Sequence, residues 1–183
     1  FIPGISKGEG LFLCVLRKRW AHDTVHEERK KRSSKSMTTK VSLPEMPQWL
    51  NADLAFDTRQ INGNIHAIPS QWTSLFDKAS TALRIVHAGV ALATPKGKDL
   101  VPHTALAHSI ALNSDAFCKC ELDYASAIAF LRREAITLHA DTPRGFVLVT
   151  HQGMPLGFVK NIGNRANNLY PQEWRIKSTH IPD

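Results

Sequence analysis

A basic segment with few apolar residues divides this chain of 183 residues. Residues 17–40 carry nine basic side chains against three acidic ones, and their only apolar residues are Trp20, Ala21, Val25 and Met37. So few apolar groups cannot offset the conformational entropy that is lost when such a stretch orders on a core. The segment is also longer than the roughly 12 to 15 residues of an ordinary loop. It therefore predicts a linker between separately folded parts.

Two interpretations of this linker remain open from composition alone. It can be a solvated tether that its own charge keeps extended. It can equally be a tether that follows the phosphates of a nucleic acid.

The residues before the linker predict one strand. A Gly-rich turn precedes LFLCVL, residues 11–16, and basic residues follow it, which is typical of a strand buried on both faces. A single strand is not stable alone, so we expect a preceding domain to supply its sheet. The first residue, Phe1, is not Met, and we therefore expect the chain to be a fragment of a larger protein.

Composition excludes some classes of protein. LFLCVL is the longest apolar run, and a membrane-spanning helix needs roughly 20 apolar residues. Three cysteines, no amino-terminal leader and no Asn-x-Ser/Thr acceptor argue against a secreted disulfide scaffold. We expect a cytoplasmic protein with no membrane part.

After the linker, short strands and helices alternate. An Asn-Gly step, Asn62 and Gly63, separates two strand-like runs and predicts a hairpin. Ser70 is predicted to cap a helix with Trp72, Leu75 and Phe76 on its apolar side. A strand is predicted over 83–94, with Gly89 at a bulge or close approach, and a helix over about 102–111. Asp123 is predicted to cap a further helix, and strands are predicted over 145–150, 154–162 and 173–178.

The carboxyl-terminal part is the positive pole of the folded unit. Residues 144–177 carry five basic side chains against Glu173, whereas residues 41–143 carry eight basic against ten acidic. The pole includes a loop rich in Asn and Gly, residues 161–171. Its amides, its cations and the face of Tyr170 meet the chemical needs of a single-stranded or looped RNA. The alternative is that Asn and Gly fill turn positions while Tyr170 and Trp174 pack inward.

Two further groups of residues are candidate sites. His103, His108, Cys118 and Cys120 could be imagined as zinc ligands, but Cys-x-Cys is not the usual knuckle and the two histidines point to different helix faces. We expect no metal, and Cys118 and Cys120 would then be two reduced thiols near a turn. Lys96 and Lys98 in TPKGKDL could contact a ligand, although a basic surface turn explains them equally well.

Three stretches carry a resemblance to a known family. Residues 7–18 resemble the closing strand of the catalytic domain in the Sun-type family of S-adenosylmethionine-dependent rRNA cytosine methyltransferases. Residues 83–112 and 144–176 are similar to the carboxyl-terminal module of its RsmF-like branch, which is a PUA-like RNA-binding domain.

The resemblance implies an α+β fold, a PUA-like mixed β-barrel or sheet with short helices. It implies a remnant strand of a Rossmann-like methyltransferase domain at 1–18, a basic linker at 19–43 and the RNA-binding domain at 44–183. The partners would be rRNA and the amino-terminal catalytic domain of the same protein. S-adenosylmethionine would serve that domain, and no cofactor is expected in this chain.

The resemblance gives no catalytic residue to this chain. The family's two cysteine-bearing motifs and its Gly-rich donor loop cannot be found here, and Cys14, Cys118 and Cys120 receive no role. The implied activity of the parent enzyme is (cytosine-5-)-methylation of rRNA. The expected RNA contacts are Lys96, Lys98, Lys160, Asn164, Arg165, Asn168, Tyr170, Arg175 and Lys177.

Two other functions stay open. The folded unit can be an internal docking domain that packs on the catalytic domain and never contacts RNA. It can also be a metal-dependent enzyme that uses the two histidines and two cysteines named above, which is the weaker hypothesis.

Overall fold

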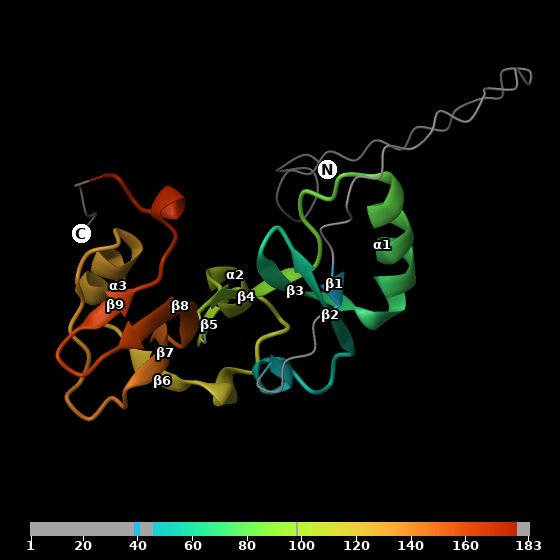
Figure 1. The fold of residues 1–183 in the computed structure, drawn as a ribbon. Coiled ribbons are helices and arrows are strands. Elements are labelled where there is room, and N and C mark those ends of the chain that lie inside the picture. The colour runs from blue at the N-terminus through green and yellow to red at the C-terminus, as the bar shows by residue number, and fades with distance from the viewer. Residues whose placement is uncertain (1–38, 41–45, 98, 179–183) are drawn as a thin grey trace, which may run out of the picture. The chain divides into compact units, whose positions relative to one another are not determined.

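The computed structural model describes residues 39–40, 46–97 and 99–178 (Figure 1). These residues lie within one compact unit, Lys35–Asp183. The strand expected at 11–16 lies outside the described residues, as does the expected linker apart from Thr39 and Lys40. These two residues form the short strand β1, Thr39–Lys40, which pairs with the next strand of the chain.

The strands form two sheets. The first sheet is antiparallel throughout, and its strands follow chain order: β1, β2 (Phe56–Ile61), β3 (Asn64–Pro69), β4 (Val90–Lys96) and β5 (Asp99–Pro102). The second sheet contains β6 (Cys118–Glu121), β7 (Gly145–His151), β8 (Met154–Asn161) and β9 (Ala166–Asn168). In the second sheet β6 runs parallel to β7, and the other pairs are antiparallel.

Short helices connect these strands. The α-helices are α1, Ser70–Ala82, α2, Thr104–Ala107, and α3, Tyr124–Leu131. Three 3₁₀ helices complete the described elements: η1, Met46–Trp49, η2, Ser114–Ala116, and η3, Gln172–Trp174. The expected α+β class is confirmed. The first sheet is antiparallel, the second is mixed, and the described strands form no closed barrel. None of the helices described is long and apolar enough to cross a bilayer.

Two of the hairpin turns follow from local chemistry. Asn62 and Gly63 have φ of 49° and 86°, the left-handed pair that a two-residue turn matched to strand twist requires. The hairpin predicted there is confirmed, since β2 and β3 pair from Ile61 with Asn64 onward. Gln152 and Gly153 make the same kind of turn between β7 and β8, with φ of 51° and 74°.

The start and the apolar face of α1 differ from the sequence prediction. Ser70 is the first helical residue, Pro69 is the N-cap, and no side chain caps the helix. Phe76 is buried against Ile61 and Ile68, and Thr73 donates a 2.7 Å hydrogen bond to Asp57 Oδ2. Packing on β2 and β3 thus selects the face with Thr73 and Phe76, and leaves Trp72 and Leu75 56% and 61% exposed.

Other boundaries were also wrong. The strand expected over 83–94 begins only at Val90, although Gly89 does lie in close approach, because a Cβ there would be 2.0 Å from Ala67 O. The helix expected over 102–111 shrinks to α2, because Pro102 pairs with Ala93 in the first sheet. The strand expected over 173–178 does not form, and Ile176 N donates to Leu131 O at the end of α3 instead.

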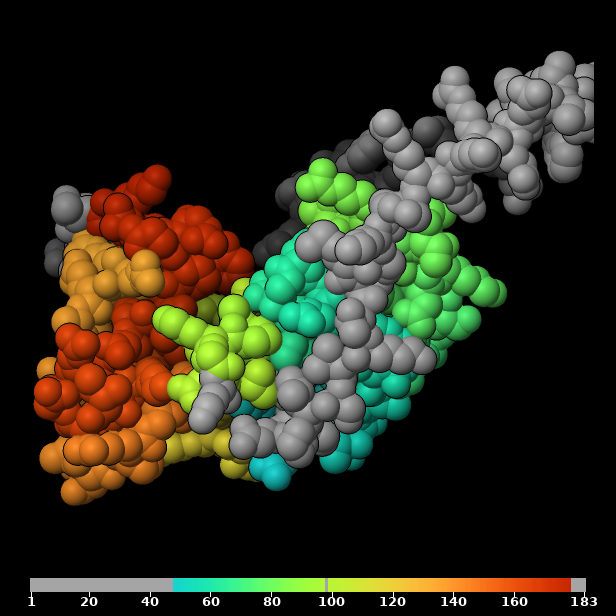
Figure 2. Space-filling view, viewed as in Figure 1, coloured from blue at the N-terminus to red at the C-terminus, as the bar shows by residue number. Residues whose placement is uncertain are grey.

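The core joins the two sheets. Ile65 and Leu92 of the first sheet and Phe158 of the second belong to one buried cluster, together with Leu106 of α2. In Figure 2 the residues of β7 to β9, orange to red, adjoin those around β5, which are yellow-green. A second cluster packs α3 on the second sheet through Phe130, Val147, Val159 and their neighbours. Removing this apolar surface from water supplies the main driving force that holds α3 in place.

Candidate functional site

The site begins where α3 ends. Arg133 N donates to Phe130 O and Glu134 N donates to Ala129 O, both at 2.9 Å, which is the Schellman pattern of helix termination. The residue in the left-handed position is Arg133, with φ 65°, where glycine is the usual residue. An arginine there has a backbone cost that glycine would avoid.

Three hydrogen bonds attach the carboxyl-terminal segment to this helix end. Ile176 N donates to Leu131 O at 3.0 Å, Arg132 Nη2 donates to Ser178 O at 2.6 Å, and Arg133 Nη1 donates to Gln172 Oε1 at 2.6 Å. Residues 172–178 therefore lie against the end of α3 although about 40 residues separate them in the chain.

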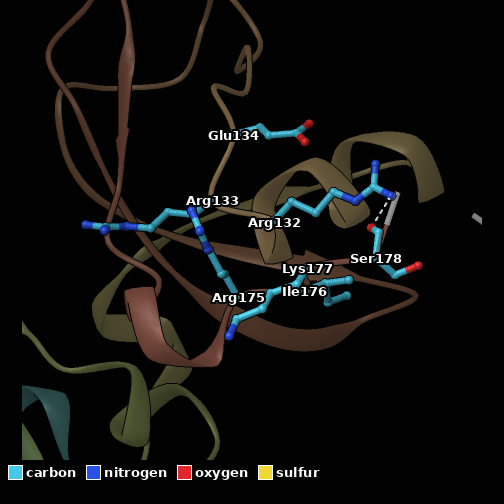
Figure 3. Close-up of a pocket in the computed structure, with 7 residues that line it drawn as sticks. All are labelled: Arg132, Arg133, Glu134, Arg175, Ile176, Lys177 and Ser178. Carbon is cyan, nitrogen blue, oxygen red and sulfur yellow. Dashed lines mark hydrogen bonds between the residues drawn. The ribbon is translucent and has the colours of Figure 1, made fainter. Parts of the chain in front are cut away.

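A cavity of about 460 Å³ opens between these two segments. Figure 3 shows Arg132 extending toward Ser178 and Arg175 extending toward Arg133. We call this site the basic cavity; its lining residues are Arg132, Arg133, Glu134, Arg175, Ile176, Lys177 and Ser178.

The basic cavity has the chemistry of an anion site. Four cations line it against one carboxylate, that of Glu134. Arg132 Nε is buried and has no hydrogen-bond partner among the described residues, and such a donor is costly unless something accepts from it. Guanidinium groups donate several hydrogen bonds in a fixed plane and match phosphate oxygens well.

Sequence reasoning found two of the four cations that line this cavity. Arg175 and Lys177 were expected as RNA contacts and both are exposed at its wall. Arg132 and Arg133 were not among the expected contacts; as cations at the carboxyl end of a helix, they also have a favourable interaction with its dipole. The signal that could have found them is the pair of arginines directly after an apolar helix, in a position where a glycine stop is usual.

A second cavity, of about 220 Å³, contains two more of the expected residues. Asn164 and Arg165 line it from one side, and the extended segment 135–140 lines it from the other. Arg144 packs over Gly163 beside it, because a Cβ on Gly163 would lie 2.7 Å from Arg144 Nε. We call this site the loop cavity; its lining residues are Ala135–Ala140, Asn161 and Gly163–Ala166.

Lys160 lies outside both cavities. Its Nζ donates a 2.7 Å hydrogen bond to Asp99 Oδ2, and it lies 5.3 Å from the centre of the Phe146 ring. The same bond lowers the pKa of Asp99 below its ordinary value. The pair connects β8 of the second sheet with β5 of the first, and the cation of Lys160 is already partly neutralised.

Asn168 and Tyr170 make contacts inside the fold. Asn168 Nδ2 donates to Phe130 O at 2.9 Å and to Glu134 O at 3.2 Å, and its Oδ1 accepts from Tyr170 N. Tyr170 packs edge-on against Phe130 at 5.4 Å and against Trp174, and burial raises the pKa of its hydroxyl. Both residues thus position the end of α3 and leave little of themselves for a ligand.

The two remaining expected contacts belong to the β4–β5 turn. Lys96 is exposed at the end of β4, and Lys98 lies outside the described residues. The structure does not place Lys96 in either cavity.

The imagined zinc ligands have separate surroundings. His103 Nδ1 accepts from Ala105 N and caps α2, and Cys120 packs on the core beneath the second sheet. Across the part of the chain that the structure describes, no three His, Cys, Asp or Glu side chains are arranged to hold a metal ion.

Comparison with known proteins locates the site within a recognised module. Residues 117–176 match the family described as the methyltransferase RsmF PUA domain. Over 93 residues, half of this chain, the sequence is 32% identical to the ribosomal RNA small subunit methyltransferase F of Erwinia tasmaniensis, and the match covers 19% of that protein's length. The expected resemblance to an RsmF-like PUA module is confirmed. The matched residues run from the residue before β6 to Ile176; they include α3, the whole lining of the loop cavity, and the lining of the basic cavity except Lys177 and Ser178.

Proposed function

We propose that this chain binds ribosomal RNA through the basic cavity and is the RNA-binding module of an S-adenosylmethionine-dependent rRNA (cytosine-5-)-methyltransferase. The observation that carries the proposal is the charge of the basic cavity, where two distant segments bring four cations together with a single carboxylate. The unpartnered Arg132 Nε adds a buried donor that a phosphate oxygen can satisfy.

The division of labour within the whole protein is part of the same proposal. A catalytic part would hold S-adenosylmethionine and the target cytosine, and residues 1–18 would be its last strand. Residues 19–43 would tether it to residues 44–183, which grip rRNA nearby and set which base reaches the catalytic part. The match to a relative about five times longer than the aligned segment supports this division.

Among the residues expected to contact RNA, contacts and charge favour some over others. Arg175 and Lys177 would bind phosphates in the basic cavity, joined by Arg132 and Arg133. Arg165 and Asn164, exposed on the neighbouring loop, would continue the contact. Lys160, Asn168 and Tyr170 would act indirectly through the interactions described above.

The test uses the full chain and a labelled rRNA hairpin in a salt series. The double variant Arg175→Ala with Lys177→Ala should bind about tenfold or more weakly, and the slope of log affinity against log salt should fall by about 1.4 if each cation neutralises one single-stranded phosphate.

A matched control removes the same charge elsewhere. Lys78 and Arg84 are exposed on and after α1, and Lys78→Ala with Arg84→Ala should leave both affinity and slope nearly unchanged. Because all variants keep the basic segment 17–40, its contribution cancels. Equal losses in the two double variants would mean that only total charge matters, and the proposed site would be wrong.

A second candidate function rests on exposed apolar side chains. Trp72, Leu75, Leu83 and Val86 are all more than half exposed on α1 and the segment after it, and such side chains can mark a protein interface. The unit would then be a docking domain that packs on the catalytic part without contacting RNA. Binding of the separately produced catalytic part, abolished by Trp72→Ala with Leu75→Ala, together with no salt-dependent RNA binding, would favour this alternative.

A further inference from the structure

One wall of the loop cavity has backbone groups that bond to no other described residue. The segment 134–139 is neither helix nor strand, and its side chains alternate, with Ile136 buried and Leu138 half-buried in the core beneath while Ala135 and Thr137 are exposed. This alternation is that of an extended strand held on one face. Among the described residues, the backbone N–H and C=O groups of 135–138 have no hydrogen-bond partner.

The opposite wall is rigid and polar. Asn161 is buried, and its amide donates to Thr142 O and Pro143 O while accepting from Gly163 N. Ile162 N donates to Arg165 O and closes the loop. These bonds hold the loop in place, so the cavity is formed before any ligand arrives.

The size of the loop cavity suits one small planar group. Its volume of about 220 Å³ equals the liquid volume of about seven water molecules and lies below the roughly 300 Å³ at which pockets for larger organic ligands begin. A free backbone edge offers alternating donors and acceptors, which are the groups that read the edge of an unpaired base in RNA.

The two cavities are neighbours along the chain. Glu134 lines the basic cavity and the next residue, Ala135, lines the loop cavity, so their Cα atoms are about 3.8 Å apart. Cations also flank the loop cavity itself, since Arg165 lines it and Arg144 packs over Gly163. A nucleotide can therefore place its phosphate on these cations while its base enters the loop cavity.

We propose that the loop cavity binds one unpaired nucleobase of the RNA whose phosphates occupy the basic cavity. This inference rests on the proposed function and adds base readout to it. The base lies against the backbone edge of 135–138, which can distinguish bases by their hydrogen-bonding groups, whereas the basic cavity holds phosphates of any sequence.

The experiment compares three RNA hairpins that differ only at one position. One has a single-nucleotide bulge, the second has an abasic bulge, and the third is fully paired. The full chain should bind the bulged RNA about tenfold more tightly than the other two. Ala135→Leu, which narrows the cavity, should lower affinity for the bulged RNA to that for the abasic RNA without changing the salt slope.

Controls separate folding from binding. Ala125→Leu makes the same substitution at an exposed position of α3 that lines neither cavity, and it should keep the preference for the bulge. If Ala135→Leu does not fold, Ala140→Leu narrows the same cavity from the other end of the segment.

The outcomes distinguish this inference from the proposed function. If the bulged and abasic RNAs bind equally well, and Arg175→Ala with Lys177→Ala still reduces the salt slope, base readout is overturned and phosphate binding in the basic cavity stands. If Arg175→Ala with Lys177→Ala changes neither the affinity nor the salt slope, both base readout and phosphate binding in the basic cavity are overturned.

Discussion

Lys160 Nζ and Asp99 Oδ2 form a 2.7 Å ion pair that joins β8 of the second sheet to β5 of the first. Lys160 was an expected RNA contact, yet its nearest charge is a carboxylate of its own chain. The Asp99 carboxylate has a lowered pKa because the ammonium of Lys160 stabilises its ionised form.

This pair leads to a prediction about charge. Lys160→Ala combined with Asp99→Asn should change RNA affinity by less than about twofold, because the double variant removes an ion pair that has no net charge. Asp99→Asn should release the ammonium, strengthen binding and steepen the salt slope by about 0.7. Anisotropy in a salt series measures both, and a loss with the double variant as large as that with Arg175→Ala would show that Lys160 contacts the RNA directly.

The left-handed conformation of Arg133 leads to a prediction that separates stability from binding. Arg133→Gly and Arg133→Ala both remove the guanidinium and should weaken RNA binding equally. Arg133→Gly should have a free energy of unfolding about 1 kcal/mol higher than Arg133→Ala, because only the alanine keeps the left-handed strain at φ 65°. Urea denaturation compares the two, and equal stabilities would mean that the helix ends differently in solution.

Asn168 is predicted to be structural. Asn168→Ala removes hydrogen bonds to Phe130 O and Glu134 O and one from Tyr170 N, and it should lower the free energy of unfolding by about 1 to 3 kcal/mol. Asn168→Asp should be worse, because a negatively charged oxygen would then face the two carbonyl oxygens and repel them. Thermal and urea unfolding report the change, and unaltered stability with weakened RNA binding would instead make Asn168 a direct contact.

One buried and one half-buried histidine, His66 and His103, predict acid sensitivity. Burial lowers the pKa of His66 and His103 below 6.5, and the neighbouring His87 lowers both further, whereas Glu173 opposes the shift at His103. The unfolded chain therefore binds protons at a higher pH than the folded chain, so stability is present above about pH 6.5 and is lost as the pH falls through the folded pKa values.

The measurement is the free energy of unfolding across the same pH range. His66→Asn should reduce the loss between neutral and mildly acid pH by roughly half, since one of two such groups is removed. His108→Asn makes the same substitution at an exposed position and serves as the control for the substitution itself. A steeper loss in His66→Asn would contradict the prediction.

Local chemistry made several elements of this chain predictable. Asn62 and Gly63 favour one turn type whatever surrounds them, and Asp123 Oδ1 accepts from Ser126 N at 2.7 Å as the cap of α3. The hairpin and the start of that helix could therefore be predicted from adjacent residues. The resemblance to an RsmF-like module also needed only the order of residues along the chain.

Contacts between distant residues could not be predicted in this way. β6 and β9 have little apolar pattern of their own, and they are strands because β7 and β8 offer free backbone groups beside them. The exposure of Trp72 and Leu75 depends on which face of α1 meets β2 and β3.

The sequence alone determined that the carboxyl-terminal part is basic, because charge is a property of composition and does not depend on folding. Only the tertiary structure decided which cations act together. Arg132 and Arg133 meet Arg175 and Lys177 because hydrogen bonds attach residues 172–178 to the end of α3, while Asp99 draws Lys160 into an ion pair. Electrostatic attraction falls with distance and screening, so a phosphate responds to the cations that the fold brings together, whatever their separation in the chain.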